Sequence, residues 1–499
     1  MIFNSMAFAI FLPIIFILYW ACPAKYRYIF LLAASFRFYM YMDIRYLVFL
    51  IFTAAVTYFL ALAIQAAGTP ALKKAYLLTG VFLLTGILIL LKYLGLFLDL
   101  TGLPSPAIQL MLPIGISFYT FQTLGYLIDI FRGKYPAERH FGYYCLFVSF
   151  FPQLLSGPIA RGDSLLPQLK KTRAFDPSAA AYGLKLMAVG YFKKLVIAGL
   201  LAPTVDNIYG QPENYTGLIY IIATVMFALQ IYCDFSGYTD IAIGCASLFG
   251  IRLEENFKSP YFSRSIREFW SRWHISLSTW FRDYVYIPLG GNRTGRFRHC
   301  LNLMLTFLIS GLWHGAGIHY ILWGAIHGIY QIAEVFAKKE LARRPTPKNA
   351  SHFFWCSTTP WRNFLLYKKN RHGGRFPSSL CHGIITFSAV CFAWVFFRAD
   401  TVSDAWRIIS LSFYGIGNFS DYLKDAVIYL DMSYEYMIYL CIPILLLAIY
   451  DYASLKTDVI RYISSKKVWV RYPVYIFFLL IILLFSEKGV STEFYYFQF

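Results

Sequence analysis

The sequence predicts an all-α, polytopic membrane protein of about twelve transmembrane helices, with further helices that re-enter the bilayer or lie along it. Of its 499 residues 58% are hydrophobic and only 14% are charged, whereas soluble proteins have about a quarter charged. Apolar stretches close to the ~20 residues needed to cross a bilayer recur along the chain. The net charge is +19, but the basic residues gather in short loops between apolar stretches, which is typical of membrane proteins. Nucleic-acid binding is therefore not expected.

Twelve apolar segments are expected to cross the membrane as helices. They are Met6–Trp20, Tyr28–Tyr41, Tyr46–Ile64, Tyr76–Leu98, Ile108–Phe131, Leu184–Leu200, Leu218–Phe249, Cys300–Gly315, Ile318–Phe336, Leu380–Phe397, Tyr434–Tyr452 and Val474–Phe485. Leu218–Phe249 is longer than one span and is expected to be broken. The first segment has no basic residue ahead of it, unlike a cleaved signal peptide, so we expect a retained helix that begins outside.

The basic clusters indicate the orientation. If each segment crosses once, the clusters all fall on one side, which is then the cytoplasm. They are Lys25/Arg27, Lys73/Lys74, Arg132/Lys134, Lys170/Lys171/Arg173, Arg264–Arg298, Lys338–Arg375 and Lys456–Arg471. Both termini are then expected to be extracytoplasmic, with the C-terminal tail 487–499 at the outer surface.

Three segments are not simple spans. Cys145–Pro158 is apolar but short and interrupted by proline, which favours a re-entrant or interfacial piece covered by protein. Ile251–Arg298 is amphipathic and is expected to lie on the membrane or fold into a cavity. Lys338–Arg375 is the longest hydrophilic loop. No internal repeat is evident, so residues 1–499 are expected to form one membrane domain.

The nine cysteines are scattered, without a Cys-x-x-Cys pair or the spacing of metal ligands. They are interpreted as small buried side chains. Neither a metal nor a bound cofactor is expected.

His314 lies in the apolar run Leu301–Gly317 and is the first catalytic candidate. An imidazole in a membrane-length segment is costly unless it has a partner or a function. The neighbouring Gly311, Gly315 and Gly317 allow close approach of another backbone. Because imidazole can take a proton from a hydroxyl near neutral pH, His314 suits general-base catalysis of acyl transfer. The alternative is a structural histidine hydrogen-bonded between helices.

His274 is the second candidate and lies in the aromatic, basic motif Ile266–Arg293. On one helix, Trp270, Trp273, His274 and Leu277 would share a face. An interfacial helix with tryptophan anchors and arginines at lipid phosphates has the same pattern. That interpretation is favoured for Arg264, Arg267 and Arg272. It explains His274 less well.

A polar sequence, CDFSGYTDIAIG, follows the apolar run Leu218–Tyr232 and contains Asp234, Ser236 and Asp240. Carboxylates at membrane depth must be paired, neutral or exposed to water. Ion pairs with the arginines of the next segment are favoured over a direct catalytic role.

The chain ends in the aromatic sequence FYYFQF, Phe494–Phe499. Such a tail can anchor the chain at the membrane interface. A tyrosine hydroxyl there could also accept an acyl group.

Five motifs in order resemble the membrane-bound O-acyltransferase family, and within it the bacterial branch that acetylates alginate and peptidoglycan. They are LPIGISFYTFQTLGYLID (Leu112–Asp129), FPQLLSGPI (Phe151–Ile159), QIYCDFSGYTDIAIG (Gln230–Gly244), FWSRWHISLSTWFRDYVYIPLGGNR (Phe269–Arg293) and GLWHG (Gly311–Gly315). The YIPLGGNR run favours polysaccharide O-acetylation over D-alanylation of teichoic acid. The resemblance covers most of the chain.

The resemblance implies a multi-helix fold around a tunnel, in the cytoplasmic membrane of a bacterium. His314 matches the family histidine and His274 the second histidine. Acetyl-CoA would be the donor substrate from the cytoplasm, and the hydroxyls of an exported polysaccharide the outer acceptor. Phe494, Tyr496 and Phe499 match the Phe-x-Tyr-x-x-Phe tail on which related enzymes carry the acyl group. An extracytoplasmic partner with a serine-hydrolase-like fold would complete the transfer.

The expected catalytic residues are therefore His314, His274 and Tyr496. The residues expected to contact substrates are Trp273, Trp313, Asp234, Ser236, Arg282 and Asn292. Two alternatives stay open: transfer of D-alanine or a longer acyl chain, and a transporter whose buried polar groups form a translocation path.

Overall fold

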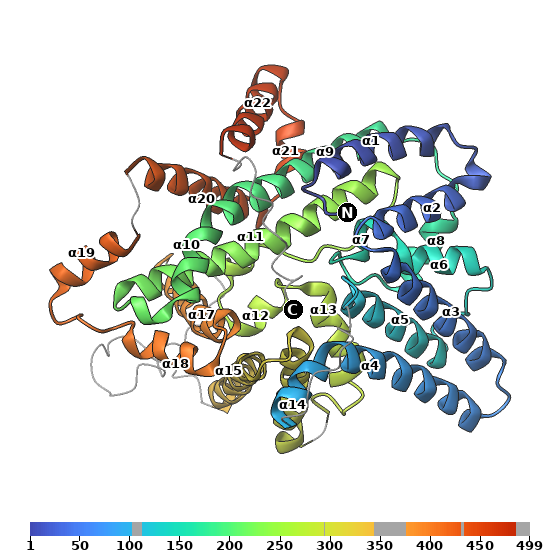
Figure 1. Cartoon of the computed structure of the whole chain (residues 1–499), viewed down its shortest axis with the longest axis horizontal. Helices are drawn as coiled ribbons and strands as arrows, with labels where there is room; N and C mark the ends of the chain where they lie inside the picture. The colour runs from blue at the N-terminus through green and yellow to red at the C-terminus, as the bar shows by residue number, and fades with distance from the viewer. Residues whose placement is uncertain (102–111, 294, 344–375, 431–433, 486–499) are drawn as a thin grey trace.

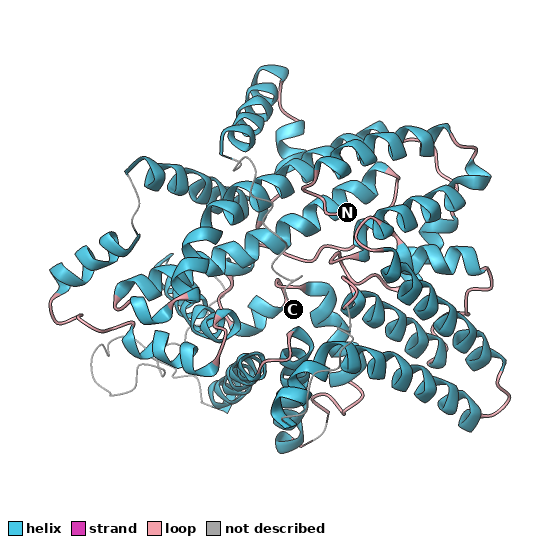
Figure 2. Ribbon diagram, viewed as in Figure 1, coloured by secondary structure: helices cyan, strands magenta, loops and turns pink. Residues whose placement is uncertain are grey.

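The computed structural model describes residues 1–101, 112–293, 295–343, 376–430 and 434–485 (Figure 1). Across these residues the chain forms helices joined by loops, and the described part contains no strand (Figure 2). In a bilayer a helix satisfies its own backbone hydrogen bonds, which explains why apolar stretches adopt it. The predicted all-α membrane fold is confirmed.

The N-terminal half contains α1 (Met6–Ala21), α2 (Arg27–Met40), α3 (Ile44–Ala66), α4 (Pro70–Thr101), α5 (Ile116–Phe131), α6 (Phe141–Ser149), α7 (Phe151–Leu154), α8 (Gly162–Lys170), α9 (Pro177–Tyr191), a π-helical turn Phe192–Ala198, α10 (Gly199–Gly210) and α11 (Leu218–Leu248). The C-terminal half contains α12 (Ile266–Trp270), α13 (Ile275–Phe281), a π-helical turn Arg282–Tyr286, α14 (Arg296–His314), α15 (Ile318–Arg343), α17 (Phe376–Arg398), α18 (Val402–Leu411), α19 (Phe419–Leu430), α20 (Tyr434–Ser454), α21 (Val459–Ser464) and α22 (Val468–Phe485).

Within the described residues, seven helices are long and apolar enough to cross a membrane. They are Ile44–Ala66, Pro70–Leu94, Pro177–Gly210, Leu218–Leu248, Leu380–Arg398, Met437–Ser454 and Val468–Phe485. The other five predicted segments lie in α1, α2, α5, α14 and α15, which are shorter or less apolar. Each segment expected to span therefore contains a helix. By length and hydropathy, seven of these helices could cross a membrane.

The long helix α11 is unbroken, which corrects the expectation that its segment is interrupted. Its two carboxylates find partners inside the protein. The π-helical turn after α9 supplies Lys193, which pairs with Asp240 at 2.8 Å, and Lys194, which pairs with Asp234. These lysines precede α11, so the predicted pairing with arginines of the next segment is also wrong. Because the charges are paired within the helix packing, the chain does not have to break to expose them.

Two pairs of glycines bring α9 and α11 into backbone contact. A Cβ on Gly183 would lie 2.5 Å from the carbonyl oxygen of Gly244, and one on Gly190 would lie 2.6 Å from that of Gly237. Small residues at helix contacts in membranes allow this close approach. The contact holds the π-helical turn and its lysines against α11.

The predicted re-entrant segment Cys145–Pro158 forms the end of α6 and the short helix α7, and its residues are buried by protein.

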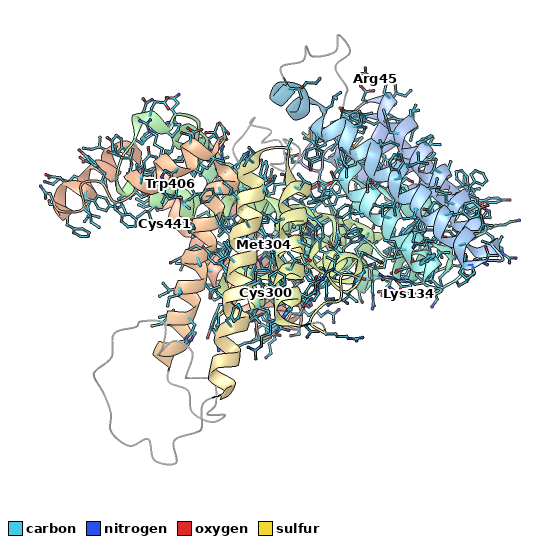
Figure 3. All side chains as sticks on the ribbon, turned by 90° about the horizontal axis from the view of Figure 1, so that it is seen from below. Arg45, Lys134, Cys300, Met304, Trp406 and Cys441 are labelled. Carbon is cyan, nitrogen blue, oxygen red and sulfur yellow. The ribbon has the colours of Figure 1, made fainter. Side chains whose placement is uncertain are left out.

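Figure 1 shows α9, α10 and α11 crossing the middle of the molecule, with α14, α15 and α17 on one side of them. α14 runs from Arg296 to His314, and Figure 3 shows two of its side chains, Cys300 and Met304, near the middle of the molecule.

Candidate active site

His314 is the last residue of α14, and only 4% of its surface is exposed. The helix ends there because Gly315 is extended, and α15 begins three residues later. A Cβ on Gly311 would lie 2.3 Å from the carbonyl oxygen of Tyr320. The glycines around His314 therefore do allow the two backbones to meet. This contact places the His314 ring 5.0 Å from the Trp323 ring.

His274 is not on a continuous helix, which corrects the expected shared face with Trp270 and Leu277. It has a left-handed backbone, with φ of 43°, and separates α12 from α13. This conformation is uncommon for a residue other than glycine, and such outliers cluster at functional sites. The side chain is 1% exposed. The local sequence does not favour this conformation, so packing against the rest of the protein must hold His274 in it.

The contact with Asn256 determines the tautomer of His274. Oδ1 of Asn256 accepts hydrogen bonds from the backbone nitrogen of Ser276, at 3.1 Å, and from its hydroxyl, at 2.9 Å. Because this oxygen is an acceptor, Nδ1 of His274, 3.2 Å away, must be the donor. A neutral imidazole then carries its lone pair on Nε2, which has no hydrogen-bond partner among the described residues.

One indole ring lies near both histidines. The Trp313 ring lies 6.2 Å from the His274 ring and 4.9 Å from the His314 ring. Phe118 of α5 lies 5.6 Å from Trp313 and 6.2 Å from His274. The structure thus brings together four of the site residues predicted from sequence. They are His274, His314, Trp313 and Trp273, which directly precedes His274 in the chain.

Three tryptophans extend the wall of this site. The rings of Trp273 and Trp394 are 5.2 Å apart, and Trp394 stacks on Trp323 at 5.9 Å. The indole N–H groups of Trp313, Trp323 and Trp394 are buried and have no hydrogen-bond partner in the described part of the chain. Buried donors are nearly always satisfied in folded proteins. These donors are therefore suited to a bound polar reactant.

Sequence reasoning missed several residues of this region. Trp323 and Trp394 lie in segments interpreted only as spans, and Asn256 lies in a polar loop. His327 of α15 is a third buried histidine, and its Nδ1 accepts from the Trp270 indole at 3.2 Å. Lys92 of α4 is a charged residue within an apolar helix, and that signal alone could have singled it out.

Asp234 and Ser236 lie in α11 on either side of Phe235, whose ring is 4.7 Å from His274. Asp234 is held in the ion pair with Lys194. The Ser236 hydroxyl is buried, with no hydrogen-bond partner among the described residues. The two residues are therefore neighbours in sequence of a ring that contacts His274, and the described contacts of Asp234 are structural.

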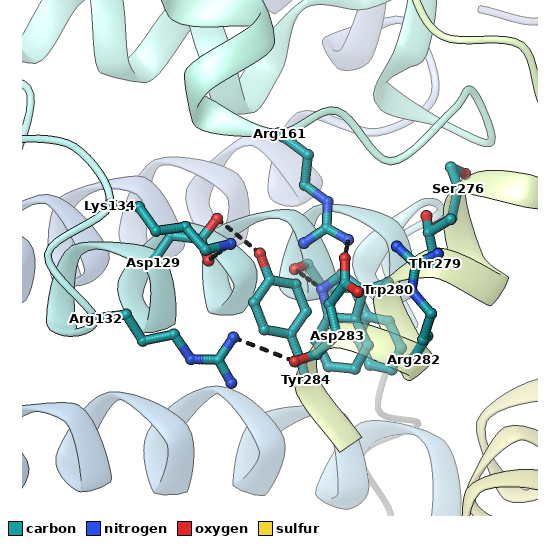
Figure 4. Close-up of polar contacts among 11 residues, drawn as sticks. Asp129, Arg132, Lys134, Arg161, Ser276, Thr279, Trp280, Arg282, Asp283 and Tyr284 are labelled. Atoms are coloured by element: carbon teal, nitrogen blue, oxygen red, sulfur yellow. Dashed lines mark hydrogen bonds and ion pairs between the residues drawn. The ribbon is translucent and has the colours of Figure 1, made fainter. Parts of the chain in front are cut away.

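Arg282 and Asn292 are not brought to the histidines. The Arg282 side chain is 59% exposed and its Nε donates to Asp283 at 2.8 Å, and Asp283 also pairs with Arg161 (Figure 4). In the same network, Tyr284 donates to Asp129 at 2.8 Å. Asn292 is exposed in the turn after this network. Arg272, expected to meet lipid phosphates, pairs instead with Glu268 at 2.7 Å.

A cavity of about 1470 Å³ adjoins the site, and Asn256 is part of its wall. Basic side chains from separate parts of the sequence line it, including Arg173, Arg252, Lys258, Arg272 and Arg461, together with the acidic side chains of Asp176, Asp240, Glu255, Asp451 and Asp458. Three of these arginines come from clusters that were expected on the cytoplasmic side. Asn256 is therefore both part of the cavity wall and a contact of His274.

Tyr496 and the tail that carries it lie outside the described residues. Within the described residues, no group of three histidine, cysteine or acidic side chains could hold a metal ion.

Comparison with known proteins agrees with this fold. Residues 137–364 match the model of the membrane-bound O-acyltransferase family. The chain is 36% identical to the probable alginate O-acetylase AlgI of Azotobacter vinelandii over 456 residues, which cover 89% of this chain and 84% of that protein. The chain therefore belongs to the membrane-bound O-acyltransferase family and is a multi-pass membrane enzyme that transfers acyl groups.

Two further relatives are named for different transfers. The chain is 33% identical over 445 residues to the peptidoglycan O-acetyltransferase of Helicobacter pylori, covering 82% of this chain and 79% of that protein. It is 27% identical over 303 residues to the teichoic acid D-alanyltransferase of Bacillus subtilis, covering 57% and 68%. Since these relatives are named as transferases, the transporter alternative is set aside.

Proposed function

We propose that this protein moves an acetyl group from cytoplasmic acetyl-CoA across the cytoplasmic membrane of a bacterium to hydroxyls of a cell-envelope or exported polysaccharide. The higher identity and longer coverage of the O-acetylating relatives support acetyl over D-alanyl transfer. Both termini are outside in this proposal, because the basic clusters then face the cytoplasm.

The observation that carries the proposal is the pair of buried histidines whose rings both lie near the Trp313 ring. His314 takes the proton from an acceptor hydroxyl, and the oxygen attacks the thioester carbonyl. The carbon–oxygen bond forms, the carbon–sulfur bond breaks, and the proton passes to the departing thiolate. His274 positions a reactant by accepting a hydrogen bond at Nε2, because Asn256 keeps its proton on Nδ1.

The cavity beside Asn256 is proposed to admit the donor. Acetyl-CoA is a thioester with a phosphate-rich nucleotide end, and arginine and lysine bind phosphate oxygens through charge-assisted hydrogen bonds. Arg252 and Lys258 line the cavity, and Asn256 lies between them in sequence and contacts His274. The nucleotide would therefore bind at the basic wall, with the thioester toward the histidines.

In this proposal the acetyl group reaches the polysaccharide acceptor through the C-terminal tail. A tyrosine hydroxyl, with its ordinary pKa of about 10, is a poor nucleophile at neutral pH and needs an adjacent base. Tyr496 would take the acetyl group at His314 and form a phenyl ester. A partner serine or a sugar hydroxyl would then displace the phenol, with a serine-hydrolase-like partner outside the membrane completing the transfer.

The test uses purified protein in liposomes with acetyl-CoA labelled in the acetyl group. Wild type is expected to release CoA and transfer label to a polysaccharide acceptor, whereas His314→Ala is expected to lose at least 100-fold in rate, as general-base catalysis is typically worth. His319→Ala is the matched control, since His319 is the next histidine in the chain. Normal transfer by His314→Ala would overturn the proposal.

A second candidate is transfer of D-alanine or another acyl group, which the match to the teichoic acid enzyme favours. It predicts that acetyl-CoA fails as donor while a D-alanyl thioester succeeds in the same liposomes.

A further inference from the structure

Lys92 lies in the apolar part of α4, far in sequence from His314, and contacts the end of α14. Its ammonium donates to the carbonyl oxygen of Trp313 at 2.6 Å and to that of His314 at 2.9 Å. The next residue, Tyr93, donates its hydroxyl to the carbonyl of Leu312. In Figure 1 the C-terminal part of α4 lies beside α14. Two adjacent side chains of α4 therefore bind three successive carbonyls at the end of the helix that carries the catalytic candidate.

Part of this arrangement is explained by helix ends alone. The last four carbonyls of a helix have no partner within it, and the C-terminal end carries partial negative charge. Hydroxyl or amide donors could satisfy these oxygens, as Tyr93 does. Satisfying carbonyls therefore does not by itself require a full positive charge at membrane depth, which costs several kilocalories per mole.

The two buried lysines Lys193 and Lys194 show how this protein compensates such a charge elsewhere. Lys193 and Lys194 each pair with a carboxylate of α11. Among the described residues, Lys92 has no ion pair. Its positive charge lies against carbonyl dipoles and 5.8 Å from the Trp313 ring centre. An ammonium has three donor hydrogens, and the two carbonyls take two of them.

We propose that Lys92 is a catalytic residue that stabilises the negative charge formed during acyl transfer, which rests on the proposed function. When the hydroxyl oxygen bonds to the thioester carbon, the carbonyl electron pair moves onto its oxygen. The third hydrogen of Lys92 donates to that oxyanion. When the carbon–sulfur bond breaks, the carbonyl reforms and Lys92 keeps all three protons. A preorganised donor of this kind acts mainly on the transition state.

The arrangement also explains why the charge is uncompensated in the resting site. A permanent carboxylate partner would attract the ammonium equally before and during the reaction and would weaken its effect on the oxyanion. Carbonyl dipoles hold the ammonium in place without neutralising it. The transient oxyanion is then the first full negative charge that Lys92 meets.

The test compares four variants by kcat and KM for acetyl-CoA. Lys92→Met removes charge and donors, Lys92→Gln keeps amide donors for the carbonyls without charge, and Lys92→Arg keeps the charge. Tyr93→Phe is the matched control, because it removes a donor to the same helix end and leaves the charge in place. Thermal unfolding in detergent, followed by size exclusion, reports whether each variant is folded.

For Lys92→Met and Lys92→Gln we expect kcat to fall by about 100- to 1000-fold, the usual loss for one oxyanion donor, with KM within a few-fold of wild type. Lys92→Arg is expected to recover most of the rate, and Tyr93→Phe to stay near wild type. Normal kcat in folded Lys92→Gln would overturn the inference, as would equal losses in Lys92→Gln and Tyr93→Phe. If the wild type itself transfers no acetyl group, the proposed function is wrong. This outcome differs from the outcomes that would overturn the inference about Lys92.

Discussion

Nδ1 of His274 donates to Oδ1 of Asn256 across 3.2 Å, and this contact links the basic cavity to the buried histidine site. Oδ1 is oriented by two further donors from Ser276, so the amide cannot turn without losing them. The imidazole is therefore held in one tautomer before any substrate binds. A catalytic group that is already oriented does not have to be reorganised during the reaction.

Replacing Asn256 should therefore affect the rate more than the fold. We expect Asn256→Ala to lower kcat by about 10- to 100-fold, the usual cost of losing a residue that orients a functional histidine. Asn256→Asp should retain more activity, because a carboxylate also accepts from Nδ1. Steady-state kinetics in liposomes measures this.

Ser276→Ala is the control for Asn256, since it removes one contact to the same oxygen without touching His274. If the two variants lose the same activity, the loss comes from a misoriented Asn256 amide and not from a change in the tautomer of His274.

The basic wall of the cavity predicts an effect on donor binding. Arg252→Glu should raise KM for acetyl-CoA by about tenfold or more, because a hydrogen bond to a charged group contributes about 1.5–3 kcal/mol. kcat should change little, since Arg252 is in the cavity wall and not at the histidines. Arg293→Glu, an exposed residue that does not line the cavity, is the control. An unchanged KM in Arg252→Glu would place donor binding elsewhere.

The tail predicts a covalent intermediate. Tyr496→Phe should abolish label on the chain after brief incubation with labelled acetyl-CoA, because the phenol oxygen that would carry the ester is gone. Tyr495→Phe is the control and should keep the label. Mass spectrometry of C-terminal peptides measures both. If Tyr496→Phe leaves acetylation of the polysaccharide intact, the tail serves as an anchor and the histidines act on the acceptor directly.

The buried pair of Asp234 and Lys194 predicts an effect on stability. Asp234→Asn should destabilise the protein by about 3–5 kcal/mol, because removing one partner leaves a buried charge uncompensated. The double variant Asp234→Leu, Lys194→Met should be closer to wild type, since neither charge then remains. Thermal unfolding in detergent compares the two. A double variant less stable than Asp234→Asn would contradict this account.

The helices and the position of His314 could be predicted from the sequence by itself. Every apolar segment expected to span contains a helix, because a chain in hydrocarbon has no other way to satisfy its backbone locally. His314 stands out because an imidazole is rare in an apolar run. His274 was also a candidate from its own motif, and the family resemblance added the expected donor and acceptor.

Only the tertiary structure decided what surrounds those residues. Asn256 and Lys92 gave no local signal of their partners, because hydrogen bonds to His274 and to the end of α14 join separate segments. The left-handed backbone of His274 and the unbroken α11 likewise depend on packing against other helices, which local propensity does not contain. Asp234 pairs with Lys194, which precedes it in sequence, and not with an arginine that follows it. Only the folded chain determines which side chains are neighbours.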